Sequence, residues 1–535
     1  MTSNLYEKFK VYLKAFRQPI VALAVINVLV ALIAFIKDIG LAAYAGTSLH
    51  ADALTIAYFI PDSISNNMFA AAISVVCVPV FSRLAALKQI NRLRRSIKQV
   101  SIRFLAISIL LMSLAYGFSG ILTEWLNGSS SSELDQVTLS LLQLLLPTIV
   151  LFVIIAIGTA VLQTLQQFIA PAIAPLLLNL IFLGGVVYCS ISGIAIEIGV
   201  SRIVLAITLG VFLTAVWIAV KWYRAMSQLV DKQESMPLIS DTNSSNDWFE
   251  MIRIFIPYVV ILFSLQAVYF AERYIITAFD SGAAAALNYA FRLTQFPVWV
   301  FVAAVSVVIL PSLSKHLALG QRKEADLVMV NAFRGVILIV LPSMLFLFLL
   351  REPLITALFQ RGAFDSHSVI LTTSILEGYA LSVLSQSISL VCLRYFLAGR
   401  QLVAVLSIYI STAMITILMD VWLSQVMGPR GIGYGAAIGA LLNAIILLYL
   451  LWNNTRPSFK LILVELKLYG KVLVLPILFF PITRVIWFWF PINNSAIALS
   501  FILLSGCVFL LGYFYVLHRH WPELFIAINN KRGKG

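Results

Sequence analysis

A few charged residues lie deep inside long apolar stretches of this 535-residue chain. A charged side chain at the centre of a bilayer costs at least about 2.5–3.5 kcal/mol, so such residues usually face a cavity or a partner charge. We predict that the deepest of them form a binding site for a substrate. They are two adjacent pairs, a further arginine and a further aspartate: Lys37 and Asp38, Glu272 and Arg273, Arg292, and Asp62.

The cations in this set indicate an anionic substrate. If Lys37, Arg273 and Arg292 line one cavity, each guanidinium can bind a phosphate through paired hydrogen bonds, and the lysine adds a further positive charge. A diphosphate suits such a cavity. Adjacent residues on a helix point about 100° apart, so we expect Lys37 and Asp38, and likewise Glu272 and Arg273, to have different partners.

Prolines accompany two of these candidates. Pro61 comes directly before Asp62, and Pro297 follows Arg292 by five residues, about one and a half helical turns. Helix breaks at membrane depth allow transporters to build binding sites from backbone and side chains together. Three further charged residues are weaker candidates because each stands close to a predicted membrane surface: Glu377, Arg394 and Asp420.

The elements that must position these residues are transmembrane helices. Hydrophobic residues make up 61% of the chain and charged residues 11%, whereas soluble domains average about 45–50% and 25%. A soluble enzyme is therefore excluded. A bilayer core of about 30 Å needs about 20 apolar residues in a helix, and we predict an all-α polytopic membrane protein with 14 transmembrane helices. The predicted spans are 20–45, 53–81, 104–123, 137–162, 170–194, 203–220, 254–278, 285–313, 328–350, 366–393, 402–423, 433–452, 472–490 and 495–517. The first span is too long for a cleavable signal and is expected to remain in the mature protein.

Basic residues predict the orientation of these spans. If the N-terminus is cytoplasmic, alternate connections are cytoplasmic too, and they hold most of the 37 Lys and Arg residues that give the net charge of +14. The positive-inside rule therefore places both termini in the cytoplasm. The basic segment Arg83–Arg103 is expected to contact anionic lipid headgroups rather than nucleic acid. The basic residues at outer ends or within spans are Lys37, Arg202, Arg273, Arg292, Arg351, Arg361, Arg430 and Arg484.

An internal repeat divides the predicted helices into two halves. Ala71–Leu87 and Ala303–Leu319 are identical at nine of seventeen positions at a constant offset of 232 residues. Both copies end a span at the predicted cytoplasmic face, which indicates a parallel repeat of two six-helix lobes, as in transporters that rock around a central site. The alternative is that duplication only builds a larger membrane protein. The predicted divisions are an N-terminal lobe (1–220), a cytoplasmic linker (221–253), a C-terminal lobe (254–452), two C-terminal helices (472–517) and a cytoplasmic tail (518–535).

Several motifs, taken in their order along the chain, resemble those of the MurJ/MviN lipid II flippases. This family belongs to the multidrug/oligosaccharidyl-lipid/polysaccharide exporter superfamily. The resemblance covers about 400 residues. The motifs that carry it are Lys37-Asp-Ile-Gly-Leu-Ala-Ala-Tyr-Ala-Gly-Thr-Ser, Ala51-Asp-Ala, Ile60-Pro-Asp, Leu162-Gln-Thr-Leu-Gln-Gln-Phe-Ile-Ala-Pro-Ala-Ile-Ala-Pro, Leu178-Asn-Leu, Tyr289-Ala-Phe-Arg-Leu, Phe296-Pro, Leu310-Pro-Ser-Leu-Ser and Leu358-Phe-Gln-Arg-Gly-Ala-Phe.

This resemblance implies a flippase in the bacterial inner membrane that moves an undecaprenyl-diphosphate-linked saccharide, lipid II, from the cytoplasmic to the outer leaflet by alternating access. It also implies that helices 13 and 14 form a groove for the polyprenyl tail. Membrane lipids and other cell-envelope synthesis proteins are the expected partners of a monomer. The sequence departs from the family where Ala31, Ser65, Asn66, Ala70 and Ala71 replace an arginine, an arginine pair and a Glu-Gly pair.

These departures keep other functions open. Lys37 also replaces a family arginine and loses its paired hydrogen-bond geometry. A flippase for another lipid-linked oligosaccharide, such as an exopolysaccharide repeat unit, is the main alternative. A drug or cation antiporter and a membrane-embedded polysaccharide polymerase are weaker ones. We expect no enzymatic activity, because the predicted outer connections are short and carry few polar groups. We expect no cofactor, and the chain has no GxxxxGK[ST] motif for ATP. Its four cysteines lie in apolar stretches without CxxC spacing, as small core residues do.

Overall fold

The computed structural model describes residues 2–87, 89–127, 132–231, 245–298, 309, 313, 316–317, 319–399, 401–455, 459–489 and 495–520. Every regular element in these ranges is a helix, and none is a strand. This result confirms the predicted all-α polytopic class. A helix satisfies its backbone hydrogen bonds internally, which is what an apolar segment in lipid requires.

Eleven helices in the described ranges are long and apolar enough to cross a membrane. They coincide with the predicted spans 1–7 and 9–12, and two shorter apolar helices, Val474–Trp489 and Ile497–Tyr513, coincide with spans 13 and 14. The predicted eighth span leaves the continuously described residues after 298, and most of the second repeat copy also lies outside the described residues. The number of 14 spans therefore stays a prediction.

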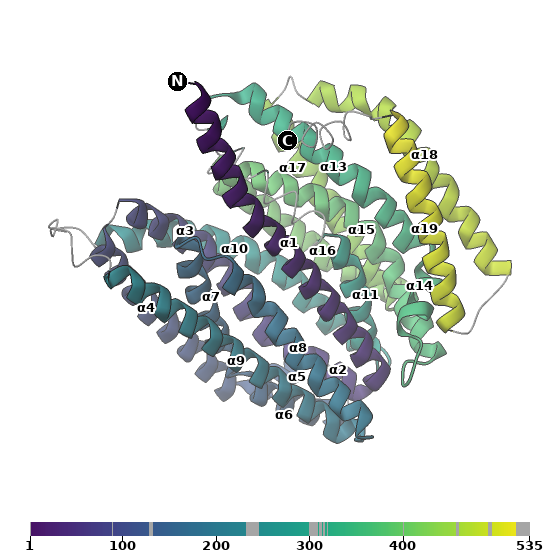
Figure 1. Cartoon of the computed structure of the whole chain (residues 1–535). Helices are drawn as coiled ribbons and strands as arrows, with labels where there is room; N and C mark the ends of the chain where they lie inside the picture. Colours follow the sequence, from purple (N-terminus) through teal and green to yellow (C-terminus); the bar gives the residue numbers. More distant parts are fainter. Residues whose placement is uncertain are drawn as a thin grey trace. The chain divides into compact units, whose positions relative to one another are not determined.

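The first of two compact units comprises Met1–Ala284. Its helices are labelled in Figure 1. Within this unit α1 packs on α8, α8 on α9, and α3 on both α4 and α7. Buried apolar side chains of α3, α4 and α7 form a common core that includes Phe81, Leu93 and Val153. The bounds are α1 Thr2–Ala45, α2 Leu49–Pro61, η1 Asp62–Ala70, α3 Ala71–Ala86, α4 Ile90–Gly117, α5 Ser119–Asn127, α6 Ser132–Leu145, α7 Thr148–Thr164, α8 Ile169–Ile191, α9 Ile196–Asp231 and α10 Ser245–Ile276.

Helix α10 contains the seventh predicted span, which the repeat assigns to the second half of the sequence. In the structure it packs on α3, η1, α4 and α5 and belongs to the first compact unit. Helices α9 and α10 both extend into the predicted linker, whose central part, 232–244, lies outside the described residues. The predicted tail leaves the described residues after 520.

The second predicted span is a helix of three parts. Helix α2 ends at Pro61, a π-helical segment η1 follows over Asp62–Ala70, and α3 continues the span. Proline lacks the backbone N–H that continues the regular hydrogen-bond ladder, and π-helical turns occur frequently at functional sites. The predicted break at Pro61 is thus a change of helix type rather than an interruption of the helix.

The second compact unit comprises Ala285–Gly535. A close seam in it joins α15 to α17, where Gly378 and Gly433 meet backbone to backbone. Gly435 and Gly439 of α17 lie equally close to α16, at Asp420 and Thr416. The bounds are α11 Ala283–Pro297, α13 Arg322–Leu349, α14 Arg351–Phe359, α15 Ser366–Ala398, α16 Leu402–Met427, α17 Arg430–Thr455, α18 Phe459–Trp489 and α19 Ser495–His520.

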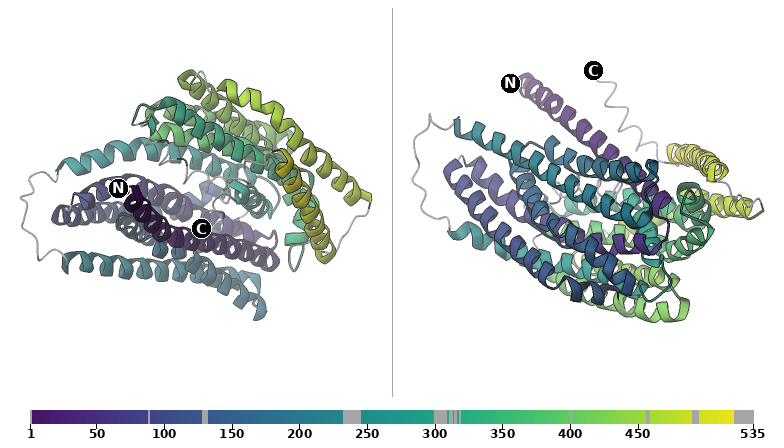
Figure 2. Two further views of the ribbon diagram at one scale, coloured as in Figure 1. Left: turned by 45° about the horizontal axis from the view of Figure 1, so that its top comes forward. Right: turned by 90° about the horizontal axis from the view of Figure 1, so that it is seen from below.

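Helices α18 and α19 pack on α13 and α14 within this unit, and they are the yellow-green and yellow helices of Figure 2. The Tyr513 hydroxyl of α19 donates a hydrogen bond of 2.5 Å to the Leu338 carbonyl of α13. The outward faces of both helices carry many exposed large apolar side chains, as lipid contact requires. Cys507 is exposed on α19, so the prediction of a core position is wrong for this cysteine, whereas Cys77, Cys189 and Cys392 are buried.

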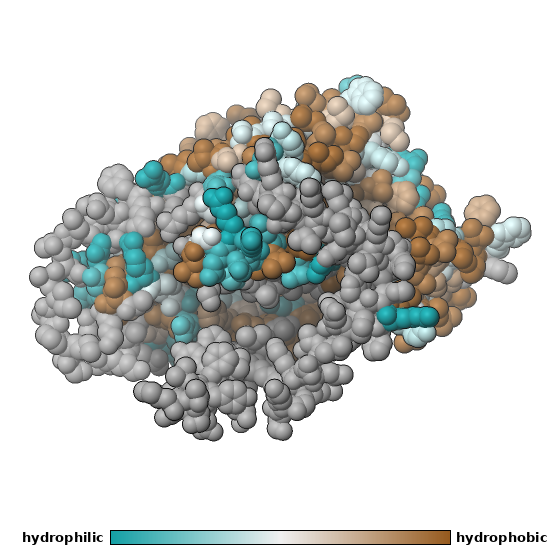
Figure 3. Space-filling view, turned by 90° about the horizontal axis from the view of Figure 1, so that it is seen from above, coloured by the Kyte–Doolittle hydropathy of each residue, from teal (hydrophilic) through white to brown (hydrophobic). Residues whose placement is uncertain are grey.

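Hydrophobic side chains make up much of the described surface in Figure 3, and hydrophilic side chains gather in separate groups. The exposed apolar residues come from most of the long helices, including α4, α9 and α16. A water-soluble monomer rarely exposes large contiguous apolar patches. The described surface is therefore that of a protein embedded in lipid.

The start of α15 gives a test of helix capping. Asp365 is its N-cap, and its carboxylate accepts hydrogen bonds of 2.8 Å from both the backbone N–H and the hydroxyl of Ser368. These bonds hold the pKa of Asp365 below its usual range. Because the folded pKa lies below the unfolded value of 3.8, the stabilisation is complete above pH 3.8 and is lost as the pH falls below it.

We expect Asp365→Ala to lower the free energy of unfolding by about 1 kcal/mol at pH 7. Asp365→Asn should keep most of the wild-type stability, because asparagine is an equally good N-cap. Thermal unfolding in detergent measures both variants. Equal unfolding temperatures for Asp365→Ala and the wild type at pH 7 would contradict the assigned cap.

Candidate functional site

Lys37 and Asp38 form a buried ion pair on α1. The Lys37 Nζ lies 2.9 Å from the Asp38 Oδ1, and the two residues are 4% and 7% exposed. The prediction that the two have different partners is therefore wrong, because the long lysine side chain bends back to reach the adjacent carboxylate. The same Nζ lies 4.5 Å from the ring centroid of Phe182 on α8, a cation–π contact that fixes the ammonium group.

Glu272 and Arg273 are also buried, near the end of α10. The Arg273 guanidinium carbon lies 3.7 Å from the ring centroid of Phe59, and its Nη1 donates a hydrogen bond of 3.1 Å to the Tyr269 carbonyl. A planar guanidinium stacks well on an aromatic face. Phe59 belongs to α2, so this contact ties α10 to the helix that leads into η1.

Asp62 opens the π-helical segment η1 and is half-buried. Its two carboxylate oxygens accept hydrogen bonds from the Asn66 Nδ2 at 3.1 Å and the Asn67 Nδ2 at 3.2 Å. These donors come from its own segment, so Asp62 stabilises the local backbone. Asn66 is one of the positions at which the sequence departs from the MurJ/MviN pattern, and its amide is engaged with Asp62.

The predicted site cations are divided between the two compact units. Lys37 and Arg273 belong to the first, whereas Arg292 lies half-buried on α11 of the second. Pro297, expected to kink the helix after Arg292, is the last residue of α11. That the three cations line one cavity stays a prediction.

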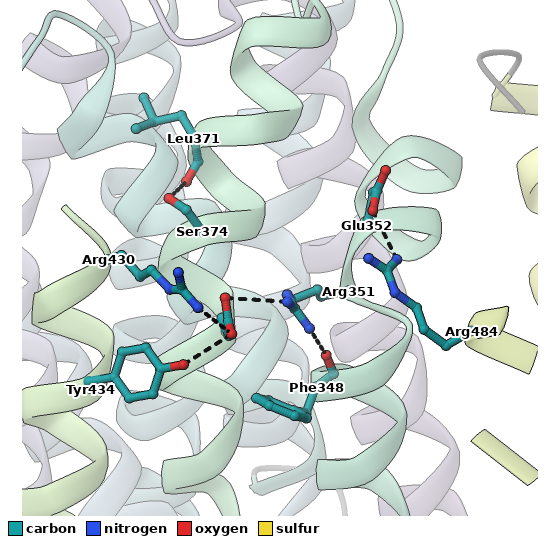
Figure 4. A network of polar contacts seen from close by, with 9 residues as sticks. Phe348, Arg351, Glu352, Leu371, Ser374, Arg430, Tyr434 and Arg484 are labelled. Atoms are coloured by element: carbon teal, nitrogen blue, oxygen red, sulfur yellow. Dashed lines mark hydrogen bonds and ion pairs between the residues drawn. The ribbon is translucent and has the colours of Figure 1, made fainter. Parts of the chain in front are cut away.

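Sequence reasoning underestimated a charged cluster in the second unit, which we call the Glu377 cluster: Glu377, Arg351, Arg430 and Tyr434. The Arg430 Nη2 lies 2.6 Å and the Arg351 Nη2 3.3 Å from the Glu377 carboxylate, and the Tyr434 hydroxyl donates to the same carboxylate at 3.0 Å. Figure 4 shows Arg430 and Tyr434 together on one side and Arg351 on the other. The cluster therefore joins α14, α15 and α17.

Burial lowers the pKa of Arg351, and the neighbouring Glu377 carboxylate opposes this shift. Arginine stays charged in either case, so the cluster holds two positive charges and one negative charge. The signal in the sequence was the pair of arginines, Arg351 and Arg430, at the predicted outer ends of spans. Their common partner could not be inferred because Glu377 lies in a different span from each of them.

The side chains of Glu377 and Arg351 are 12% and 18% exposed, whereas that of Arg430 is 42% exposed. We expect Glu377→Gln to lower the free energy of unfolding by about 2 kcal/mol, between the values for exposed and buried pairs, because the two arginines then lack a neutralising carboxylate. Glu352→Gln is the matched control. Glu352 pairs with Arg484 at 2.9 Å, but the two side chains are 45% and 30% exposed, so its loss should cost no more than about 1 kcal/mol. Thermal unfolding in detergent compares the two variants. An equal loss of stability in both would contradict the larger contribution to stability that we assign to the Glu377 cluster.

Asp52 is a buried acidic residue that sequence reasoning did not single out as a site residue. Its Oδ2 accepts a hydrogen bond of 2.6 Å from the Gly282 backbone N–H. Gly282 has φ +93°, and an added Cβ would meet the Thr47 backbone, so only glycine fits. Asp52 therefore fixes the connection that leads from α10 into α11.

The chain is similar in sequence to proteins described as lipid II flippases. A protein-family model described as "Lipid II flippase MurJ" matches residues 41–506. The chain is 24% identical over 464 residues to the probable lipid II flippase MurJ of Rhizobium tropici, and the match covers 82% of this chain and 83% of that protein. It is 23% identical over 438 residues to the lipid II flippase MurJ of Burkholderia cenocepacia, covering 80% and 83%.

Solved structures share the fold. A structure described as lipid II flippase MurJ in an inward closed conformation matches with a TM-score of 0.72 and 20% identity, covering 94% of this chain and 100% of that chain. An inward-facing multidrug resistance transporter of the MATE family, in the MOP superfamily, matches with a TM-score of 0.66 and 14% identity, covering 82% and 99%. At these identities the likeness concerns the fold alone.

Proposed function

The chain belongs to the MurJ family of lipid II flippases, and we propose that it moves lipid II, an undecaprenyl-diphosphate-linked saccharide, from the cytoplasmic to the outer leaflet of a bacterial membrane. The match of the family model over residues 41–506 carries this proposal. The many apolar helices agree with a multi-pass membrane protein. Its substrate is therefore a lipid whose headgroup bears a diphosphate.

Buried cations give this substrate a binding mechanism. Lys37 is held by Asp38 and Phe182, and Arg273 by Phe59 and the Tyr269 carbonyl. Both charges are thus positioned before the substrate arrives, and little side-chain conformational entropy is lost when a diphosphate binds. The diphosphate competes with Asp38 for the lysine, so the headgroup can be released again. Arg292 provides the corresponding charge in the second unit.

In this mechanism the protein alternates between inward-open and outward-open states, while the polyprenyl tail stays in the bilayer. Both termini are cytoplasmic, and the chain acts as a monomer without chemical change to the substrate. The energy comes from the membrane potential, an ion gradient or mass action. The location of basic residues supports this orientation.

A second candidate is a flippase for another lipid-linked oligosaccharide. It is favoured by the polar residues of η1, where Ser65 and Asn66 stand in place of a family arginine pair. Since Asn66 donates to Asp62, this segment contributes no positive charge to a diphosphate site. A different headgroup could be accommodated by these neutral side chains.

Complementation separates the two candidates. The chain is expressed in a bacterial strain depleted of its essential lipid II flippase, and growth is recorded. Restored growth is expected for a lipid II flippase. No growth at verified membrane expression, together with restored export in a strain lacking an exopolysaccharide flippase, would favour the second candidate.

A further inference from the structure

Neutral polar side chains link α11 to α15 in the second unit through consecutive hydrogen bonds. The Gln295 Nε2 donates to the Gln386 Oε1 at 3.0 Å, and the Gln386 Nε2 donates to the Ser382 Oγ at 2.8 Å. The Ser382 hydroxyl donates in turn to the Tyr379 carbonyl at 2.7 Å. We call Gln295, Gln386 and Ser382 the amide chain. Each residue donates a hydrogen bond to the next, and the last bond is accepted by a backbone carbonyl. The orientations of the three side chains are therefore fixed.

The amide chain contributes little to stability. A hydrogen bond between side chains of transmembrane helices averages about 0.6 kcal/mol, and a leucine in place of Gln386 would leave no polar group of its own to be desolvated. Polar residues at membrane depth usually serve function. One helical turn after Gln386, the buried Ser389 hydroxyl has no hydrogen-bond partner within the described part of the chain. This face of α15 therefore offers more polar groups than its packing uses.

Gln386 keeps hydrogen-bonding capacity for a ligand. Its carboxamide has two N–H donors and a carbonyl oxygen with two lone pairs, and the amide chain engages one donor and one lone pair. The side chain is half-buried. A site that both donates and accepts suits a hydroxyl or an amide, which do the same. A phosphate only accepts, and arginine recognises it better.

Gln295 and Arg292 lie on the same face of α11, because residues three apart are neighbours on a helix. Their separation along the axis is about 4.5 Å, from the rise of 1.5 Å per residue. A group joined directly to a phosphate bound at Arg292 would therefore lie beside the amide chain. In a diphosphate-linked saccharide, the first sugar is the group joined to the phosphate that is farther from the polyprenyl chain, so this phosphate is the one bound at Arg292.

We propose that the amide chain recognises the saccharide of the transported lipid and so determines its specificity, with Gln386 as the residue that contacts the sugar. This inference rests on the proposed function. The hydroxyl and acetamido groups of an amino sugar are the ligand class that it fits. The diphosphate is bound separately, by the cations.

Binding of two lipids to the purified full-length protein tests this proposal: undecaprenyl diphosphate, and the same lipid carrying the disaccharide of lipid II. Gln386→Leu should weaken binding of the saccharide-linked lipid about tenfold and leave binding of undecaprenyl diphosphate unchanged. Arg292→Ala should weaken both. Asn443→Leu is the matched control, because it breaks a buried hydrogen bond of 2.9 Å between α17 and Thr412 of α16; it should change neither affinity.

An equal loss for both lipids in Gln386→Leu would overturn the proposal and assign the amide chain to packing, and no loss for either lipid would overturn it too. If Gln386→Leu does not fold, Gln295→Leu is used instead, and a selective loss of the saccharide-linked lipid is again required. Wild-type protein that binds neither lipid would contradict the proposed function itself, so the two failures are distinguishable.

Discussion

Lys37→Glu is expected to reduce lipid II translocation at least about 100-fold. Two carboxylates then stand side by side in a buried position where the wild type has an ion pair of 2.9 Å. Removing one partner of a buried charge pair between a protein and its ligand costs about 2–5 kcal/mol of binding free energy, and about 3 kcal/mol corresponds to roughly 100-fold in an equilibrium. The diphosphate also meets a negative charge where the wild type offers a positive one. Growth of the depleted strain and translocation in vesicles both measure the effect.

Lys37→Arg is the matched control for this prediction. It keeps the charge and supplies the paired hydrogen-bond geometry that phosphate prefers, so translocation should stay within about threefold of the wild type. Thermal unfolding of both variants separates a folding defect from a transport defect, and Lys37→Met serves if Lys37→Glu does not fold. If Lys37→Glu translocates lipid II at the wild-type rate, Lys37 does not contact the substrate.

Gly433→Leu is expected to lower the free energy of unfolding by at least about 3 kcal/mol. A Cβ at this position would meet the Ile375 carbonyl and the Tyr379 backbone N–H of α15, and backbone atoms cannot turn aside as a flexible side chain can. Overpacking of a close contact costs about 1–3 kcal/mol even when only side chains must move. The same shift would separate Arg430 and Tyr434 from Glu377. The unfolding temperature in detergent and the yield of folded protein measure this effect.

Gly335→Ala is the control for this second prediction. Gly335 lies within α13 of the same unit, and nothing stands within 4 Å of the Cβ that alanine would add. Alanine is the better helix former by about 1 kcal/mol, so this variant should be as stable as the wild type or more stable. A small effect in Gly433→Leu, within about 0.5 kcal/mol of Gly335→Ala, would contradict the close contact between α15 and α17.

Hydropathy predicted most of the helices because lipid imposes one demand, a run of about 20 apolar residues with internally satisfied hydrogen bonds. The ends were less predictable. Helix α9 continues to Asp231 through a basic stretch, and helix α10 begins at Ser245, since a helix can extend into water where hydropathy no longer marks it. The π-helical form of η1 was not predictable. A proline indicates that the regular hydrogen-bond ladder is disturbed, but it does not indicate which type of helix replaces it.

For the charged side chains, burial was predictable from the sequence but the interaction partners were not. Burial of Lys37, Asp38, Glu272 and Arg273 agrees with the expectation that charges at membrane depth avoid lipid. The Lys37–Asp38 pair does not follow from the direction of the two Cβ atoms, because the lysine side chain is long enough to reach the adjacent carboxylate.

Partners far apart in the sequence are harder to predict. The Glu377 cluster and the Gln295–Gln386 bond join residues 53 and 91 positions apart. Such pairings depend on which helices are neighbours. Apolar periodicity alone does not determine that.

Translocation of labelled lipid II by the purified protein in vesicles tests the central claim most directly. The label is placed on the headgroup, and a membrane-impermeant quencher reports which leaflet holds it. Wild-type vesicles should exchange lipid II between leaflets far faster than protein-free vesicles, Lys37→Arg should do the same, and Lys37→Glu should match the protein-free rate. Exchange in wild-type vesicles no faster than without protein, at verified folding and insertion, would contradict the assignment of this chain as a lipid II flippase.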